Sequence, residues 1–176
     1  MQKSRFSVFV MLFVILMTHH SLFSQEVKND VLYKIVSPSG LVIDNLNSAE
    51  DAGHIYLAKD NPKSKGQYWR FMTVRDRYAI YCPFNIKGMD VVEGQGDKFP
   101  VNLWGYSRGN RNQHWILKQL PDGSYSISHA NSGMFLATSD GEKKGSMIYI
   151  SSKDMGGWRL EATTMKLPPE GFIGKQ

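Results

Sequence analysis

The stretches GQYWRFM (residues 66–72) and NQHWILK (residues 112–118) share a short pattern: a glutamine, any residue and a tryptophan, followed by alternating apolar and polar residues. A third tryptophan followed by a similar alternation lies in GGWRLEA (residues 156–162). The three tryptophans are 46 and 43 residues apart along the chain: Trp69, Trp115 and Trp158. A spacing this regular indicates an internal repeat, which has to be recognised before the fold can be predicted.

A second landmark recurs with nearly the same period. Each unit opens with a tyrosine and, two residues later, an isoleucine, in LYKIVS, RYAIYC and SYSISH. Between the two landmarks each unit holds two further short runs that alternate at period two, separated by Gly, Asp and Asn. Such alternation predicts four strands in each unit, and no window has convincing helical periodicity. The sequence therefore predicts an all-β protein of three repeats, at about residues 31–76, 77–122 and 123–162.

Twelve short strands in three similar units favour a closed structure with pseudo-threefold symmetry, because a propeller needs ~4 to 8 blades. At this point the chain resembles the ricin-type β-trefoil family, whose members repeat a Gln-x-Trp motif three times. Two exact copies and a degenerate third extend the resemblance from Val31 to about Ala162. The resemblance implies a β-trefoil of three four-stranded repeats. It also implies that the motif tryptophans pack in the core and that the motif glutamine ties its repeat together by hydrogen bonds.

The N-terminus has the pattern of a secretory signal peptide. Lys3 and Arg5 precede an apolar run at residues 6–17, and polar residues with a small Ser24 follow. The run is shorter than the ~20 residues that cross a bilayer. We expect a signal peptide at residues 1–24, cleaved near Ser24, and a secreted or periplasmic protein with no membrane span after its removal.

The remaining chain is expected to form one trefoil domain at residues 25–165. The tail at residues 166–176 contains two prolines, and we expect either a strap across the barrel or a loose linker. Cys82 is the only cysteine, so no intramolecular disulfide can form and packing has to stabilise the fold. Because Cys82 ends an apolar run before a proline, we interpret it as a small buried side chain at a strand end rather than a reactive thiol.

The charge does not favour nucleic-acid binding. Removing Lys3 and Arg5 from the formal net charge of +5 leaves +3, which is only mildly basic. Arg108 and Arg111 belong to the densest basic cluster, and we expect them to be solvated loop charge rather than a phosphate-binding track.

Motifs for catalysis are absent from the sequence. There is no Gly-x-Ser-x-Gly turn and no glycine-rich phosphate loop. His54, His114 and His129 occur one per repeat, without the close spacing of metal ligands. His114 alternates with Trp115 and is expected to be exposed. We therefore predict a non-enzyme with no catalytic residues, no metal and no cofactor.

Repeat two carries a set of polar and aromatic residues that the other repeats lack. In ricin-type lectins the matching positions form a shallow galactose site, so the resemblance implies a sugar site here: Asp90, Asn102, Trp104, Asn112 and Gln113. Trp104 should point outward, because Val101 and Leu103 beside it are expected to point inward, and an aromatic plane suits the C–H face of a hexose. Asp90 would accept hydrogen bonds from two hydroxyls, Asn112 would donate one, Gln113 would hold Asp90, and Asn102 could add a contact.

Each residue alone also has a simpler interpretation. Asp90 could end its strand as a turn former, and Asn112 could be an ordinary loop residue. Repeat one offers a possible degenerate second site: Asp44, Tyr56 and Gln67. There Ala58 stands where repeat two has Trp104. In repeat three Ile150 is expected at the position of Trp104 and the acid is absent, which predicts a purely structural role.

Two functions remain open from the sequence. The first is a secreted lectin-like module that binds galactose-type or related glycans through repeat two. A single shallow site would bind weakly, so oligomerisation or clustered glycans would be needed for avidity. The alternative is a protein-binding trefoil, such as a protease inhibitor or a toxin-complex subunit, that uses its polar loops and has no sugar site.

Overall fold

The computed structural model describes residues 26–92, 95–139 and 141–169. The predicted signal peptide, residues 1–24, and the end of the tail, residues 170–176, lie outside the described residues. The described residues form thirteen strands and two short 3-10 turns. None of the helices in this part of the chain is long and apolar enough to cross a membrane.

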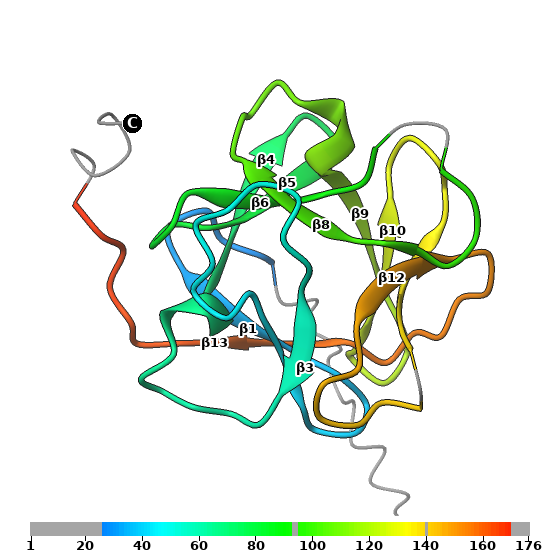
Figure 1. Ribbon diagram of the computed structural model, residues 1–176, viewed down its shortest axis with the longest axis horizontal. Helices are drawn as coiled ribbons and strands as arrows, with labels where there is room; N and C mark the ends of the chain where they lie inside the picture. Colours follow the sequence, from blue (N-terminus) through cyan, green and yellow to red (C-terminus); the bar gives the residue numbers. More distant parts are fainter. Residues whose placement is uncertain (1–25, 93–94, 140, 170–176) are drawn as a thin grey trace, which may run out of the picture.

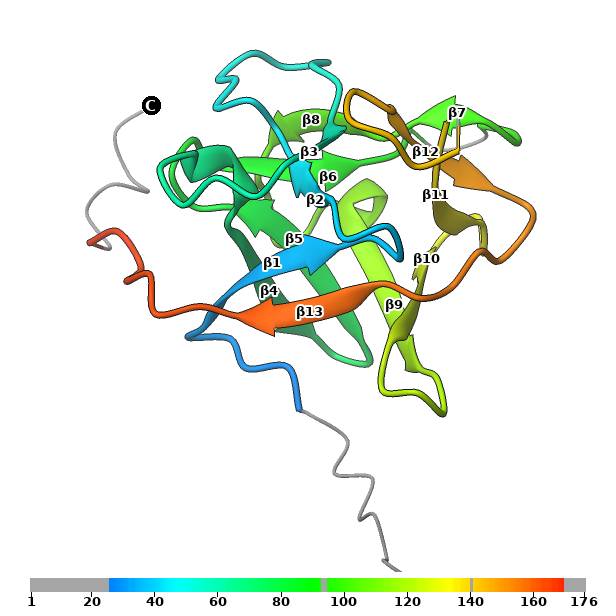
Figure 2. The same cartoon turned by 90° about the horizontal axis from the view of Figure 1, so that it is seen from below.

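Six strands close into a barrel. They are β1 (Leu32–Val36), β4 (Trp69–Val74), β5 (Arg77–Cys82), β9 (His114–Gln119), β10 (Tyr125–His129) and β13 (Arg159–Ala162). Antiparallel pairing runs in the order β1, β4, β5, β9 and β10, and β13 pairs with β1. A bridge between Tyr125 and Trp158, just before β13, joins the two ends of this order. Figure 2 shows β1 and β13 side by side, crossing the barrel. The ring of pairings confirms the predicted closed barrel.

Three hairpins complete the fold, one from each repeat. They are β2 (Val42–Asp44) with β3 (Tyr56–Ala58), β6 (Lys87–Asp90) with β8 (Asn102–Gly105), and β11 (Phe135–Thr138) with β12 (Ile148–Ser151). Backbone hydrogen bonds join the hairpins to one another: Leu57 N to Ser146 O (2.8 Å), Val101 N to Ile148 O (3.0 Å) and Leu103 N to Gly53 O (2.7 Å). Three repeats of four strands around one barrel make the chain a β-trefoil, as the sequence predicts (Figure 1).

One strand was not predicted. The two-residue β7 (Phe99–Pro100) precedes β8 and pairs with β12 of the third repeat. It is too short to leave a periodic signal in the sequence, and its existence depends on a partner about 50 residues away. The two 3-10 turns, η1 (Lys65–Gln67) and η2 (Arg111–Gln113), occupy the same place in repeats one and two.

The three tryptophans occupy equivalent positions in the core. Each lies opposite the tyrosine that opens its own repeat: Tyr33 with Trp69, Tyr78 with Trp115, and Tyr125 with Trp158. Their exposed fractions are 0%, 0% and 1%. Each indole Nε1 donates to a backbone carbonyl of its own hairpin, those of Ile43, Met89 and Leu136, at 3.0–3.1 Å. One packing arrangement is therefore used three times, which confirms that these tryptophans are core residues.

The structure shows the burial of Cys82 and of His114. Cys82 is fully buried at the end of β5, and burial raises the pKa of its thiol, so the interpretation as a structural residue is confirmed. His114 was expected to be exposed, and this is wrong, because its exposed fraction is 6%. His114 lies opposite Ala79 across β5 and β9, and its side chain contacts the segment between β8 and β9, where its Nε2 donates to Arg108 O at 2.9 Å.

The described part of the tail lies against the body of the protein. Met165, Lys166, Pro168 and Pro169 line one side of a cavity of about 660 Å3, and Phe84 of the turn between β5 and β6 lines it as well. This contact concerns residues 165–169 only, so a strap across the barrel and a loose linker both stay predictions.

Candidate functional site

The register of β6 and β8 brings three of the predicted site residues to one face of a hairpin. Asp90 lies opposite Asn102, and Gly88 lies opposite Trp104. Residues directly opposite each other in an antiparallel pair point to the same side, so Asp90, Asn102 and Trp104 share a face. The residue between each pair points into the core, as the fully buried Leu103 shows. Trp104 is 48% exposed, which confirms the expected outward direction of this side chain.

Gln113 packs over the middle of this face. A Cβ atom on Gly88 would come within 2.7 Å of the Gln113 side chain, so the close approach requires a glycine there. The amide of Gln113 is fully used: Nε2 donates to Asp90 Oδ2 (3.1 Å) and to Gly105 O (3.0 Å), and Oε1 accepts from Ser107 N (3.0 Å). The expected hydrogen bond between Gln113 and Asp90 is therefore present, and it fixes the orientation of the carboxylate.

The carboxylate of Asp90 is held by one oxygen only. Asn110 Nδ2 donates to Oδ2 at 2.9 Å, in addition to the bond from Gln113. Among the residues that the structure describes, Oδ1 accepts no hydrogen bond. Asp90 is nevertheless only 4% exposed. One acceptor oxygen with two lone pairs is thus left at the surface of the hairpin for an outside donor.

Burial has a clear electrostatic effect on this group. Desolvation raises the pKa of Asp90 above its ordinary value of 3.8, while the hydrogen bonds from Gln113 and Asn110 act in the opposite direction. The nearby charge of Asp51 raises the pKa further. The ionised carboxylate is therefore destabilised when no ligand is bound. A ligand that donates hydrogen bonds to it would offset the free energy of desolvation.

This leads to a prediction for the pH dependence of stability. Because the pKa of Asp90 is higher in the folded than in the unfolded protein, its favourable contribution is present below the unfolded pKa and is lost as pH rises through the folded pKa. The Asp90→Asn variant does not titrate here. We therefore expect its free energy of unfolding, relative to wild type, to increase between about pH 3 and about pH 7, measured by urea denaturation. A difference that stays constant or falls over this range would contradict the pKa direction.

The remaining two site residues make different contacts. Asn102 is half-buried, and its Oδ1 lies 2.9 Å from Nδ1 of His54, which reaches it from repeat one. Asn112 has no side-chain hydrogen bond among the described residues, but its carbonyl accepts from Val91 N at 3.0 Å. Its backbone is therefore fixed beside the end of β6, while its amide is available to a ligand.

Asn110 is the residue that sequence reasoning missed. It caps η2, accepting from Asn112 N at 3.1 Å, and its own amide holds Asp90. Ser64, three residues before Gln67, takes the same place in repeat one and donates to Asp44. The signal that could have found both is a capping residue three positions before each motif glutamine.

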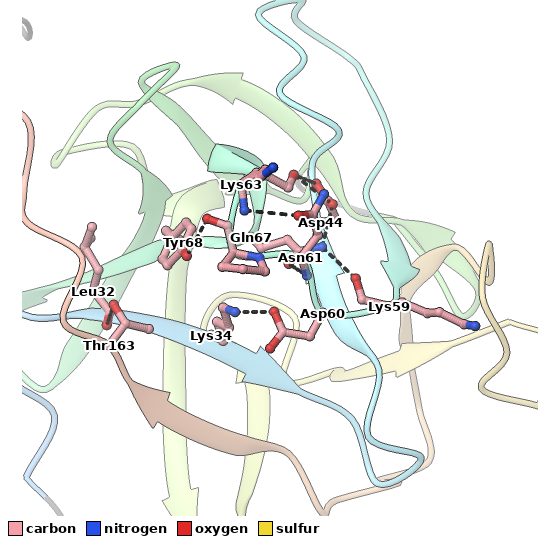
Figure 3. A network of polar contacts seen from close by, with 12 residues as sticks. Leu32, Lys34, Asp44, Lys59, Asp60, Asn61, Lys63, Gln67, Tyr68 and Thr163 are labelled. Carbon is pink, nitrogen blue, oxygen red and sulfur yellow. Dashed lines mark hydrogen bonds and ion pairs between the residues drawn. The ribbon is translucent and has the colours of Figure 1, made fainter.

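Repeat one differs from repeat two at its carboxylate. Oδ2 of Asp44 accepts from Gln67 Nε2 (2.9 Å) and Ser64 Oγ (3.1 Å), and Oδ1 accepts from Leu46 N (2.7 Å). Figure 3 shows Asp44 and Gln67 turned toward each other within this network. Both oxygens of Asp44 are therefore used inside the protein.

The aromatic residue is also missing from repeat one. Tyr56 lies opposite Asp44, where Asn102 lies opposite Asp90, and it is half-buried. Ala58 occupies the position equivalent to Trp104. Asp44, Tyr56 and Gln67 thus retain the frame of the site without its open acceptor or its exposed aromatic plane.

Repeat three requires one correction. The sequence count placed Ile150 at the position of Trp104, and this is wrong, because Ile150 pairs with Leu136 and is fully buried. The register makes Ser151 the equivalent of Trp104, since it lies opposite Phe135. The shortened loop in this repeat displaced the count by one residue, which in a strand reverses the face. Repeat three therefore has Ala137 in place of Asp90 and Ser151 in place of Trp104, while Tyr149 lies opposite Ala137 as Tyr56 lies opposite Asp44.

In the part of the chain that the structure describes, no group of three or more His, Cys, Asp and Glu side chains is placed to hold a metal ion. No protein-family model matches the sequence, and the search of curated proteins found no match.

Solved structures do resemble this protein. A designed threefold-symmetric protein, ThreeFoil, has 28% sequence identity and a TM-score of 0.67, over 74% of this chain and 97% of the design. The exo-β-1,3-galactanase 1,3Gal43A from Clostridium thermocellum has 26% identity and a TM-score of 0.68, over 78% of this chain but only 31% of the enzyme. The C-half of the earthworm R-type lectin, solved in complex with GalNAc, has 15% identity and a TM-score of 0.57, over 76% of this chain and 99% of the lectin.

Toxins with the same fold are also similar. They include a mosquitocidal holotoxin and the cytolethal distending toxin of Haemophilus ducreyi, at 19% and 11% identity. At such identities the similarity of the lectin and of the toxins shows the fold alone. The solved structures that resemble this chain thus include a lectin and toxins.

Proposed function

We propose that this protein is an exported lectin-like module that binds a galactose-type or related glycan through a single site in repeat two. The site consists of the five residues predicted from the sequence, with Asn110 as a supporting residue. One observation carries the proposal: Oδ1 of Asp90 is an open, fixed acceptor on the same hairpin face as the exposed Trp104.

The chemistry of the face suits a hexose. Adjacent sugar hydroxyls need acceptors and donors at fixed positions, and the carboxylate of Asp90 and the amide of Asn112 supply one of each. The indole of Trp104 offers a flat apolar surface for the C–H groups of the ring. Gln113 and Asn110 hold the carboxylate before the ligand arrives, which lowers the entropic cost of binding.

The comparison between repeats supports a single site. Asp44 uses both carboxylate oxygens inside the protein, and the position of Trp104 is filled by Ala58 in repeat one and Ser151 in repeat three. A single shallow site binds weakly, so we expect clustered glycans or an oligomer in use. Export, secreted or periplasmic, rests on the signal-peptide pattern of the sequence.

We propose a non-enzymatic role for the same residues. Asp90 is the only carboxylate in the proposed site, whereas glycoside hydrolysis commonly uses a pair of carboxylates across the scissile bond. The similar galactanase matches over less than a third of its length, so its activity gives no reason to assign catalysis to this chain.

The proposal is tested by a glycan array probed with three forms of the protein: wild type, Trp104→Ala and Asp90→Ala. A Met155→Ala variant is the control, because Met155 is an exposed apolar residue of repeat three. We expect galactose-terminated glycans to bind wild type and the control, and both site variants to lose them. No binding by folded wild type, or binding that both site variants retain, would reject the site and favour the protein-binding alternative.

A further inference from the structure

Four arginines from two separate parts of the chain gather around one pocket. Arg75 lies in the turn between β4 and β5, and Arg77 is the first residue of β5, whereas Arg108 and Arg111 belong to the segment between β8 and β9. The pocket has a volume of about 490 Å3, and the turn between β10 and β11 closes it at Ala130 and Asn131. From the sequence, Arg108 and Arg111 were expected to be solvated loop charge, and the other two arginines are more than 30 residues away along the chain.

The positive charge of this pocket is poorly compensated. Asp76 is the one carboxylate among the described residues that line it, and its Oδ1 lies 3.6 Å from Nε of Arg77. Arg108 donates to a backbone carbonyl, that of Thr73, at 3.0 Å. Arg75 and Arg111 are exposed, and their side chains make no ion pair or hydrogen bond with the described residues. Two guanidinium groups thus have all of their donors available.

Arg75 lies in the two-residue turn between β4 and β5, which accounts for its backbone conformation. Arg75 has a φ of 59°, in the left-handed region where a glycine or asparagine would be less strained. His114 supports the opposite wall, since its Nε2 donates to Arg108 O and holds that loop.

The shape and lining of the pocket select the class of ligand. Planar guanidinium groups recognise oxyanions such as sulfate, phosphate and carboxylate by paired hydrogen bonds. Single-stranded nucleic acid is usually held by aromatic stacking beside the basic groups, and among the described residues no Phe, Tyr or Trp lines this pocket. A discrete pocket also fits one anionic substituent better than a continuous phosphate backbone.

The pocket adjoins the proposed sugar site. Arg108 and Arg111 flank Asn110, which holds Asp90, so one loop contributes to both sites. We propose that this arginine pocket binds a sulfate ester or similar oxyanion group carried by an acidic glycan. The glycan identity of the ligand rests on the proposed function, whereas the oxyanion site rests on the arginines alone.

The test is affinity electrophoresis of the protein, expressed from the full-length chain, in gels that contain dextran sulfate or uncharged dextran. The pocket variant is Arg75→Asn/Arg111→Gln, in which Asn suits the left-handed backbone and neither side chain has a partner to lose. The matched control is Lys143→Gln/Lys144→Gln, which removes the same charge from two exposed residues that do not line the pocket.

We expect dextran sulfate, and not dextran, to retard wild type. The dissociation constant should rise by about tenfold or more in the arginine variant, because charge-assisted bonds are lost, and less than about twofold in the lysine variant. Equal weakening in both variants would show a response to net charge and overturn the proposal, as would the absence of retardation. Tighter binding of an oligonucleotide through the same arginines would reject the glycan class.

The two proposals can fail separately. The Trp104→Ala and Asp90→Ala variants are expected to keep their affinity for dextran sulfate. If the neutral glycan array is blank while the arginine variant alone loses dextran sulfate, the sugar site fails and the oxyanion pocket stands.

Discussion

The Trp104→Ala variant is expected to bind galactose-terminated glycans at least about tenfold more weakly than wild type, a loss of roughly 1.4 kcal/mol or more. The substitution removes the only large apolar surface of the proposed site, while Asp90 and its hydrogen bonds remain. Isothermal titration calorimetry with a glycan that binds in the array measures the change. Because Trp104 is 48% exposed, its removal should change the free energy of unfolding by no more than about 0.5 kcal/mol.

The control for this prediction is Ile116→Ala. Ile116 is also exposed, at 38%, but it lies on the barrel strand β9 and not on the β6–β8 face. We expect its glycan affinity to equal that of wild type. Undiminished binding by Trp104→Ala would show that the indole does not contact the sugar.

Replacement of a core tryptophan is expected to lower the stability of the protein, in contrast to replacement of the exposed Trp104. Trp115→Ala should lower the free energy of unfolding by about 3–5 kcal/mol, because it leaves a large cavity in the barrel. It also leaves the carbonyl of Met89 without its donor. Since small domains have a total stability of roughly 5–15 kcal/mol, much of the protein could be unfolded. Urea denaturation followed by circular dichroism measures the loss.

The pseudo-threefold symmetry supplies matched comparisons. Trp69→Ala and Trp158→Ala remove the same indole-to-carbonyl bond in the other repeats, so their losses should be similar to that of Trp115→Ala. A loss below about 1 kcal/mol in any of the three would contradict the equivalence of their packing.

The fold could be predicted because its signals are periodic. Gln67, Gln113 and the three tryptophans recur at spacings that only a repeated structure explains, and strand alternation fills the intervals between them. β7 could not be predicted, because two residues carry no period and the strand forms only against β12. The burial of His114 was missed because alternation shows only that its side chain points away from that of Trp115, and not that the loop of Arg108 contacts it there.

The candidate site was only partly accessible from the sequence. Asp90, Trp104 and Gln113 follow from counting within the repeat, since counting works where two repeats align without a gap. The same count failed at Ile150, where a shortened loop changed the register. The contact between His54 and Asn102 joins two repeats, so neither position indicates it alone.

The arginine pocket could not be predicted from the sequence, because its residues are far apart along the chain. Arg75 and Arg108 are 33 residues apart, and only the closure of the barrel brings their turns together. The open oxygen of Asp90 was also beyond the sequence, because Asp44 has the same spacing to its glutamine and yet uses both oxygens internally.

The most direct test of the account compares these two aspartates. Isothermal titration calorimetry would measure the affinity of wild type, Asp90→Asn and Asp44→Asn for one galactose-terminated glycan. The account predicts that Asp90→Asn loses affinity by at least about tenfold, because a charge-assisted hydrogen bond is worth roughly 1.5–3 kcal/mol, and that folded Asp44→Asn binds as wild type does. Equal loss in both variants, or loss in Asp44→Asn alone, would contradict a single sugar site in repeat two.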